Sequence, residues 1–147
     1  MNAIALLKQM HQEAKSAFQK LEQGEPNQRL AIWDKLQPEL VRHEELEETL
    51  FYPELKKVDT TEEIILEAYQ EHHVMDVLIK EISALKPGDE AFQPKVTVLQ
   101  ENTEHHIEEE EQDLFPKVRK LWDRAKREKV GAAMEEQAER AKDKRAA

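Results

Sequence analysis

The sequence His43-Glu44-Glu45-Leu46-Glu47-Glu48 continues to Tyr52-Pro53, and a second copy, His106-Ile107-Glu108-Glu109-Glu110-Glu111, continues to Phe115-Pro116. The second copy begins 63 residues after the first, and each places a Glu four residues after its His. Side chains four residues apart are neighbours on one face of an α-helix. Each copy therefore directs an imidazole and a carboxylate to a common point, and two copies predict two half-sites for metal.

Length and composition indicate one small, helix-rich domain. The chain has 147 residues, three Gly and 37% charged residues. It lacks an apolar run long enough for a membrane span, and its first residues lack the basic region of a signal peptide. We therefore expect a cytoplasmic location, no membrane partner and, as a starting assumption, a monomer.

Charge and cysteine content narrow the classes of site and partner. A formal net charge of −10 argues against nucleic acid as a partner, because that needs a basic surface. The chain has no cysteine, which excludes thiolate zinc sites and iron–sulfur clusters. Any metal must be bound by His and carboxylates.

Helix-breaking residues divide the chain into four long stretches and a tail. The expected connections are Gly24-Glu25-Pro26-Asn27, Pro53 to Thr61, and Lys86-Pro87-Gly88-Asp89. Short connections between long helices predict an all-α fold, an antiparallel up-down-up-down four-helix bundle. Pro38 predicts a kink or a late start of the second helix.

The domain prediction is a bundle over residues 1–125, followed at 126–147 by a charged C-terminal helix or a flexible tail. Val130 and Met134 would pack such an outer helix on the bundle.

Apolar residues at helical spacing show which polar side chains face the core. On the fourth stretch this stripe runs through His106 to Leu114 and Leu121, whereas His105 points away from it. The same reasoning on every stretch predicts one set of inward polar residues: His11, His43, Glu47, His72, His106 and Glu110.

The energetics of burial favour metal binding for this set. A single inward His is more often a core residue hydrogen-bonded to a carbonyl. Buried carboxylates, however, cost several kcal/mol each unless they are paired or bind a cation. The cost of burying four His and two Glu would be large compared with a net stability of about 5–15 kcal/mol. A bound metal would satisfy these side chains, and its binding would add to the stability of the fold.

The donor set favours two iron ions. It exceeds the four ligands of a structural zinc, and mixed imidazole and carboxylate donors suit a pair of iron or manganese ions. Of these metals we favour iron over manganese and zinc. Glu44 and Asp76 are further candidates, either as ligands or as hydrogen-bond partners of ligands. The counterpart of Glu44 in the second copy is Ile107, which predicts an asymmetric site.

The remaining polar and aromatic residues are expected to be structural. A solvated face is predicted for a group of neighbouring residues: His73, His105, Glu45, Glu48, Glu108 and Glu109. Core or helix-end packing is predicted for the large aromatic residues Trp33, Phe51, Phe115 and Trp122. Tyr52 and Tyr69 could lie near the metals.

From Ile4 to Trp122 the chain resembles hemerythrin-like proteins of the HHE cation-binding family. The residues that carry the resemblance are His11, His43-x-x-x-Glu47-Glu48 with Tyr52-Pro53, Glu71-His72, and His106-x-x-x-Glu110-Glu111 with Phe115-Pro116. The resemblance implies a four-helix bundle with a non-heme diiron centre, bridged by oxo or hydroxo, whose ligands match these positions.

Departures from oxygen-carrying hemerythrins bear on function. Those proteins have a His-x-x-x-His pair on the third helix, where this chain has His72 with Asp76, and a His-x-x-x-x-Asp pair on the fourth, where it has His106 with Glu110. The resemblance thus implies an iron protein that meets oxygen, peroxide or nitric oxide in sensing, detoxification or iron handling.

Three other functions stay open at this point. The first is a reversible oxygen carrier or storage protein, and the second is an enzyme with catalase-like turnover of peroxide. The third is a metal-free helical interaction module.

Overall fold

The structure, a computed structural model, describes residues 1–86 and 88–146. Pro87 and Ala147, which belong to the predicted third connection and C-terminal segment, lie outside the described residues. The described part is helical and has no strand: α1 (Ala3–Gln23), α2 (Pro26–Leu46), η1 (Glu47–Phe51), α3 (Tyr52–Leu55), α4 (Glu62–Ser83), α5 (Phe92–Glu109), η2 (Glu110–Leu114), α6 (Phe115–Leu121) and α7 (Arg124–Ala146).

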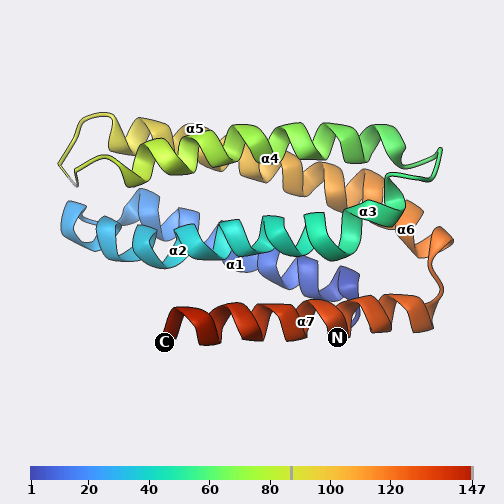
Figure 1. Cartoon of the computed structure of the whole chain (residues 1–147). Helices are drawn as coiled ribbons and strands as arrows, with labels where there is room; N and C mark the ends of the chain where they lie inside the picture. The colour runs from blue at the N-terminus through green and yellow to red at the C-terminus, as the bar shows by residue number, and fades with distance from the viewer. Residues whose placement is uncertain (87, 147) are drawn as a thin grey trace.

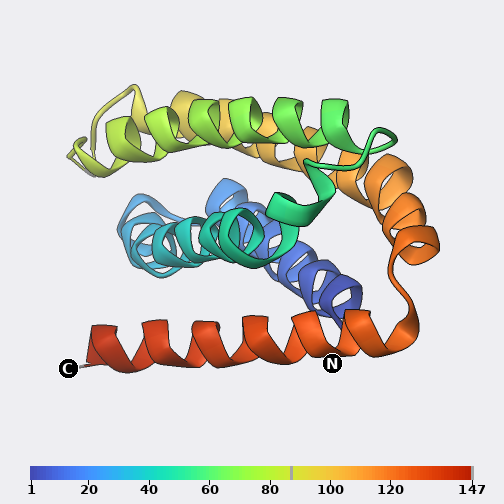
Figure 2. The same cartoon turned by 45° about the vertical axis from the view of Figure 1, so that its right-hand side comes forward.

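Two helical hairpins form the bundle. The helix α1 packs on α2, α4 packs on α5, and further contacts join α1 to α5 and α2 to α4. Figures 1 and 2 show the two hairpins side by side, with α7 crossing below the first. The predicted all-α bundle with up-down-up-down order is confirmed. Among the described helices, none has the length and apolar character needed to cross a membrane.

Helix starts follow local capping, and one of the two outcomes expected at Pro38 does not occur. The Asn2 side chain accepts a hydrogen bond from the Ala5 backbone N–H at 2.9 Å and caps α1. The helix α2 begins at Pro26, where a missing N–H costs nothing. It then continues through Pro38. The late start that Pro38 predicted therefore does not occur.

The chain stays helical through both aromatic-proline pairs. A π-helical segment precedes each pair, η1 before Tyr52-Pro53 and η2 before Phe115-Pro116. The backbone N–H of Tyr52 donates to the Glu47 carbonyl, five residues back, and Phe115 donates to Glu110 in the same way. Proline lacks an N–H, which disfavours an ordinary α-helical turn at this point.

The π-helical turn η2 changes which of the following residues face the core. Leu121, placed on the inner stripe by a regular 3.6-residue period, is 41% exposed. Phe115, Val118 and Trp122 are buried instead. An extra residue in the η2 turn rotates all later positions around the helix axis, so the regular period fails there.

The apolar core consists of two clusters separated by a polar layer. One contains Leu7, Leu46 and Phe115, and the other contains Phe18, Leu40 and Leu99. Between them along the helices lie the buried polar residues His11, Glu47, His72, His106 and Glu110. The predicted core positions of the four large aromatic residues are confirmed: Trp33, Phe51, Phe115 and Trp122.

The C-terminal segment forms the helix α7, which packs across the start of α1. Met134 is fully buried and Val130 packs against the first apolar cluster. Asp123 caps the helix by accepting from the Lys126 N–H at 2.8 Å. A Cβ at Gly131 would lie 2.2 Å from the Met1 carbonyl oxygen and 2.7 Å from the Ala3 nitrogen. Only glycine allows this approach.

We expect Gly131→Ala to lower the free energy of unfolding by about 1–3 kcal/mol, because the added methyl group overpacks the contact between α7 and the N-terminus. Gly88→Ala is the matched control, since nothing lies within 4 Å of a Cβ there. Thermal unfolding of both variants checks this. A gain in stability for Gly131→Ala, as helix propensity alone would give, would contradict the packing.

Candidate metal centre

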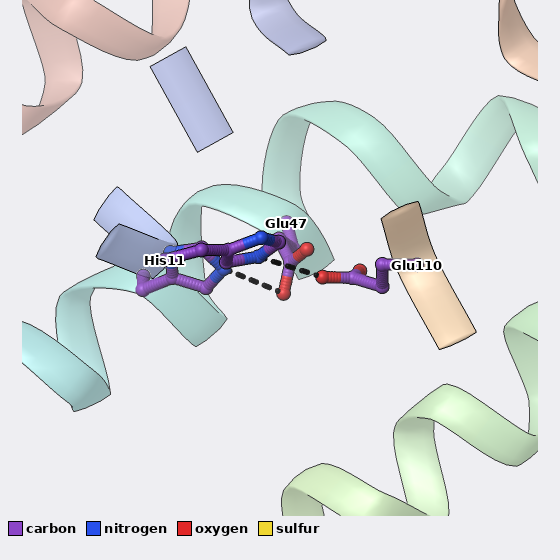
Figure 3. A group of neighbouring side chains, drawn as sticks. His11, Glu47 and Glu110 are labelled. Carbon is purple, nitrogen blue, oxygen red and sulfur yellow. Dashed lines mark hydrogen bonds and ion pairs between the residues drawn. The ribbon is translucent and has the colours of Figure 1, made fainter. Parts of the chain in front are cut away.

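The structure brings the six predicted inward residues together in the polar layer at the centre of the bundle. Among these six residues, two groups have donor atoms within 4.8 Å of one another: His11, His43, Glu47 and Glu110, and Glu47, His72 and His106. Glu47 belongs to both groups. Figure 3 shows His11, Glu47 and Glu110 pointing toward one another from three different helices.

Each central carboxylate lies between imidazoles of two helices. The Oε1 atom of Glu47 lies 3.2 Å from Nε2 of His43 and 3.1 Å from Nε2 of His72. The Oε1 atom of Glu110 lies 3.1 Å from Nε2 of His11 and 3.5 Å from Nε2 of His106. All four imidazoles therefore turn the same ring nitrogen, Nε2, toward the centre.

Three of the imidazoles are held from outside by a further carboxylate. The Nδ1···Oε distances are 2.7 Å for His11–Glu111, 3.2 Å for His72–Glu48 and 2.7 Å for His106–Glu71. A carboxylate accepts from Nδ1–H, which leaves the Nε2 lone pair for a cation. The outer carboxylates thus fix both the tautomer and the direction of each ring.

Glu48 was assigned to a solvated face, which holds only in part, because its side chain is 37% exposed but also lies against His72. Its carboxylate bonds to His72 across the bundle, and Glu111 bonds to His11 in the equivalent way. Each follows directly after a central Glu, at the start of a π-helical segment. The repeated Glu-Glu pair was the available signal, but a regular helical period turns the second Glu outward.

The other predicted solvated residues are not part of the centre. His73, Glu45 and Glu108 are exposed. His105 is 64% exposed and contacts Glu109 at 2.9 Å. These assignments agree with the sequence prediction.

Tyr52 places a hydroxyl group in the second group of donors. The phenol is fully buried, and its O–H donates to Oε2 of Glu110 at 2.6 Å. The hydroxyl oxygen of Tyr52 also lies 3.3 Å from Nε2 of His106 and 3.4 Å from Nε2 of His72. Burial and the negative charge of Glu110 raise the pKa of Tyr52 well above its usual value, so the phenol keeps its proton.

The buried charges shift one another's pKa values. Burial lowers the pKa of His106, but the carboxylates of Glu110, Glu47 and Glu71 outweigh it and raise that pKa well above its usual value. The pKa values of His11 and His72 are raised in the same way. Burial raises the pKa of Glu47, yet His43 and the hydrogen bonds around Glu47 hold it well below its usual value.

Two observations show that these residues fit a bound cation. The Oε2 atom of Glu47 is fully buried and has no hydrogen-bond partner. The Nε2 atoms of His72 and His106 lie only 3.2 Å apart, a distance at which two N–H groups would repel. Within the described chain, no Lys or Arg forms an ion pair with Glu47 or Glu110. A metal cation would satisfy all these atoms.

Glu44 and Asp76 lie beside the centre. Glu44 is only 4% exposed, and it forms a group of possible metal ligands with Glu48 and His72. Burial and a hydrogen bond with Asp76 raise the pKa of Glu44 to about 10. Glu44 therefore keeps its proton at neutral pH.

A small cavity opens onto the imidazoles. Its volume is about 30 Å³, enough for one or two small molecules of the size of water. All four imidazoles reach it, and its apolar wall includes Ala14, Leu40, Met75 and Ile107.

Comparisons with known proteins agree with this geometry. The Hemerythrin HHE cation binding domain matches residues 2–118. A crystal structure of an HHE cation-binding domain-containing protein from Mycobacterium kansasii is similar at a TM-score of 0.84 and 25% identity, covering 96% of this chain and 87% of that one.

A curated relative from Nostoc sp., named as a DNA nickase, is 27% identical over 124 residues and 81% of this chain. The match covers only 34% of that longer relative. The family match spans most of the chain and includes all six inward residues. The chain therefore belongs to the hemerythrin HHE cation-binding domain family.

Proposed function

We propose that the chain binds two iron ions between its four inward imidazoles, and that the iron senses or reacts with oxygen, peroxide or nitric oxide. The observation that carries the proposal is the arrangement of Glu47 and Glu110, each shared between imidazoles of two helices. His11 and His43 would hold one ion and His72 and His106 the other, with both carboxylates between them. Tyr52 offers a further oxygen on the His72 side.

The residues around the ions would set their environment. Bound iron supplies Lewis acidity and one-electron redox chemistry toward a small ligand. The outer carboxylates Glu48, Glu71 and Glu111 orient the imidazoles. Tyr52 holds a proton 2.6 Å from Glu110. Leu40, Met75 and Ile107 line the cavity and exclude bulk water. Such a pocket favours a small, weakly polar ligand over a large substrate.

We expect Glu47→Gln to reduce bound iron to half or less of the wild-type amount, because the amide has no charge to balance the cations. The stabilisation by iron, about 2.7 kcal/mol at one hundred times the dissociation constant, should shrink accordingly. The metal-free variant should be less stable than the wild type, because the amide leaves the surrounding protonated imidazoles without their buried carboxylate partner. Metal analysis and thermal unfolding with and without iron measure both effects.

Glu45→Gln is the control for that experiment, because Glu45 lies two residues before Glu47 and is exposed. Wild-type iron content in Glu47→Gln would refute the assignment of Glu47. Equal melting temperatures of the wild type with iron and with chelator would favour a metal-free interaction module.

We expect Ala14→Leu to slow peroxide consumption by the iron-loaded chain about tenfold or more, at unchanged iron content, because the larger side chain fills the cavity. Ala17→Leu is the control, since Ala17 lies on the same helix outside the cavity. Rates are followed by absorption after adding peroxide. If the wild type consumes peroxide no faster than free iron does, the catalase-like activity is refuted. An unchanged rate in Ala14→Leu would show that ligands enter elsewhere.

The raised pKa values predict opposite effects of pH on the two forms. In the metal-free chain, His11, His72 and His106 keep protons that the unfolded chain loses above a pH of about 6.5. Their stabilisation is complete below that pH and is lost as pH rises through the raised pKa values. Glu44, with a pKa raised to about 10, acts in the same direction.

Iron, in contrast, binds only deprotonated Nε2 atoms, so its stabilisation grows with pH. The melting temperatures of the iron-loaded and metal-free chains should therefore diverge between a pH of about 6 and about 9. Calorimetry at several pH values measures the difference. A metal-free chain that becomes more stable over this range would contradict the proposed protonation.

A further inference from the structure

Glu71, His105 and Glu109 form an outer group of possible metal ligands on the second hairpin. Donor atoms of the three side chains lie within 4.8 Å of one another. The Nε2 atom of His105 lies 2.9 Å from Oε1 of Glu109 and 3.9 Å from Oε2 of Glu71. Glu71 comes from α4, and the other two residues come from α5. None of the three belongs to the two inward groups of the proposed centre.

The sequence contains the signal for this outer group. His105 and Glu109 repeat the spacing of the inward His-x-x-x-Glu pair, one residue earlier in the chain. A shift of one residue is a rotation of about 100° around the helix axis, so one pair faces the core and the other faces outward. The first copy of the motif has Arg42 and Leu46 at the corresponding positions. Only the second copy can therefore form an outward pair of ligands.

The distances in the outer group suit one small divalent cation. Two ligand atoms of a tetrahedral zinc ion, each about 2.0–2.1 Å from the metal, lie about 3.3 Å apart. The two distances from Nε2 of His105, 2.9 and 3.9 Å, lie on either side of this value. Zinc accepts imidazole together with carboxylate, whereas calcium and magnesium prefer oxygen ligands alone. Zinc is therefore the ion that these donors fit best.

Glu71 is held in place before any cation binds. Its Oε1 atom accepts from Nδ1–H of His106 at 2.7 Å, which leaves Oε2 to face His105. A surface ion pair between His105 and Glu109 would need no further carboxylate. Across the described residues, no Lys or Arg forms an ion pair with Glu71 or Glu109. Two carboxylates thus converge on one imidazole, and a divalent cation would balance their charge.

We propose that Glu71, His105 and Glu109 form a peripheral site for a divalent transition-metal ion, of which zinc is the best match. The side chains are 19%, 64% and 27% exposed, so the ion can enter from solvent and complete its coordination with water. The site stands on the outer group alone and does not require iron in the centre.

The peripheral site would act on the centre through Glu71, and this effect rests on the proposed function. Glu71 would bind zinc through Oε2 while Oε1 keeps its hydrogen bond to His106. A cation on the carboxylate draws electron density from it and weakens that hydrogen bond. Carboxylates bonded to a metal-binding imidazole tune its basicity and the properties of the metal. Zinc at the surface would therefore regulate the iron that His106 holds.

The test is a calorimetric zinc titration of the iron-loaded chain, with released iron measured in the same samples. We expect the wild type to bind one zinc ion per chain and to keep its iron. His105→Ala and Glu109→Gln should each weaken zinc binding about tenfold or more. Because His105 is largely exposed, its loss should leave the fold intact, as circular dichroism would verify. His73→Ala is the matched control, since His73 is an exposed imidazole on α4.

Two results of the titration would overturn the peripheral site. One is a wild type that binds no zinc, or His105→Ala with wild-type affinity. The other is zinc that displaces iron equally from the wild type and from His105→Ala, because that zinc would occupy the centre.

The effect on the centre is measured by the near-ultraviolet absorption of the iron-loaded chain, where zinc itself does not absorb. Zinc should change the spectrum of the wild type and of His73→Ala and leave that of His105→Ala unchanged. A wild-type spectrum that bound zinc does not alter would overturn regulation through Glu71.

A failure of the proposed function can be told apart from a failure of this inference. A wild type that takes up no iron would refute the proposed function and, with it, regulation of the centre. Zinc is then titrated into the metal-free chain, where it can also bind the central imidazoles. One zinc ion fewer in His105→Ala than in His73→Ala would still support the peripheral site, and equal numbers would overturn it.

Discussion

Burial of Glu47 and Glu110 in the middle of the bundle is the constraint on which the other features of the site depend. The two side chains are 0% and 2% exposed, and the apolar core is split into two clusters on either side of them. Two carboxylates in this position need positive charge nearby. The surrounding imidazoles supply it in the metal-free chain by taking up protons, which explains the raised pKa values of His11, His72 and His106. In the proposed loaded state, iron would replace those protons.

The π-helical segments let one short motif serve both the inside and the outside of the site. Glu47 and Glu110 reach the centre of the bundle. The residues that follow them, Glu48 and Glu111, each reach an imidazole of the other hairpin. The extra residue in each turn also aligns the aromatic residue before the proline with the same imidazoles. Tyr52 stacks near His72 at 5.5 Å, and Phe115 stacks on His11 at 5.9 Å. The repeated sequence therefore produces repeated packing around the centre.

Sequence reasoning could predict the bundle and the inward residues because both follow from a regular helical period. It placed His11, His72 and the two His-x-x-x-Glu pairs on the apolar stripes, and the structure brings all six together. It failed where the period breaks. Leu121 was misplaced, and the contact of Glu48 with His72 was missed, because each π-helical turn adds a residue to the helix. Glu71 was found only through the family resemblance, since its role depends on a contact with His106 on another helix.

The two halves of the site are similar but not equivalent, and the differences all lie on one side. Beside His72 and His106 there is a hydroxyl from Tyr52, whereas beside His11 the equivalent residue is Phe115, an apolar ring. Glu44 adds a buried carboxyl group near His72, and its counterpart is Ile107. One half is therefore richer in oxygen donors and protons than the other. Oxygen donors favour the more oxidised state of a bound ion, so two irons held here would differ in reduction potential. That difference follows from single substitutions in an otherwise repeated motif.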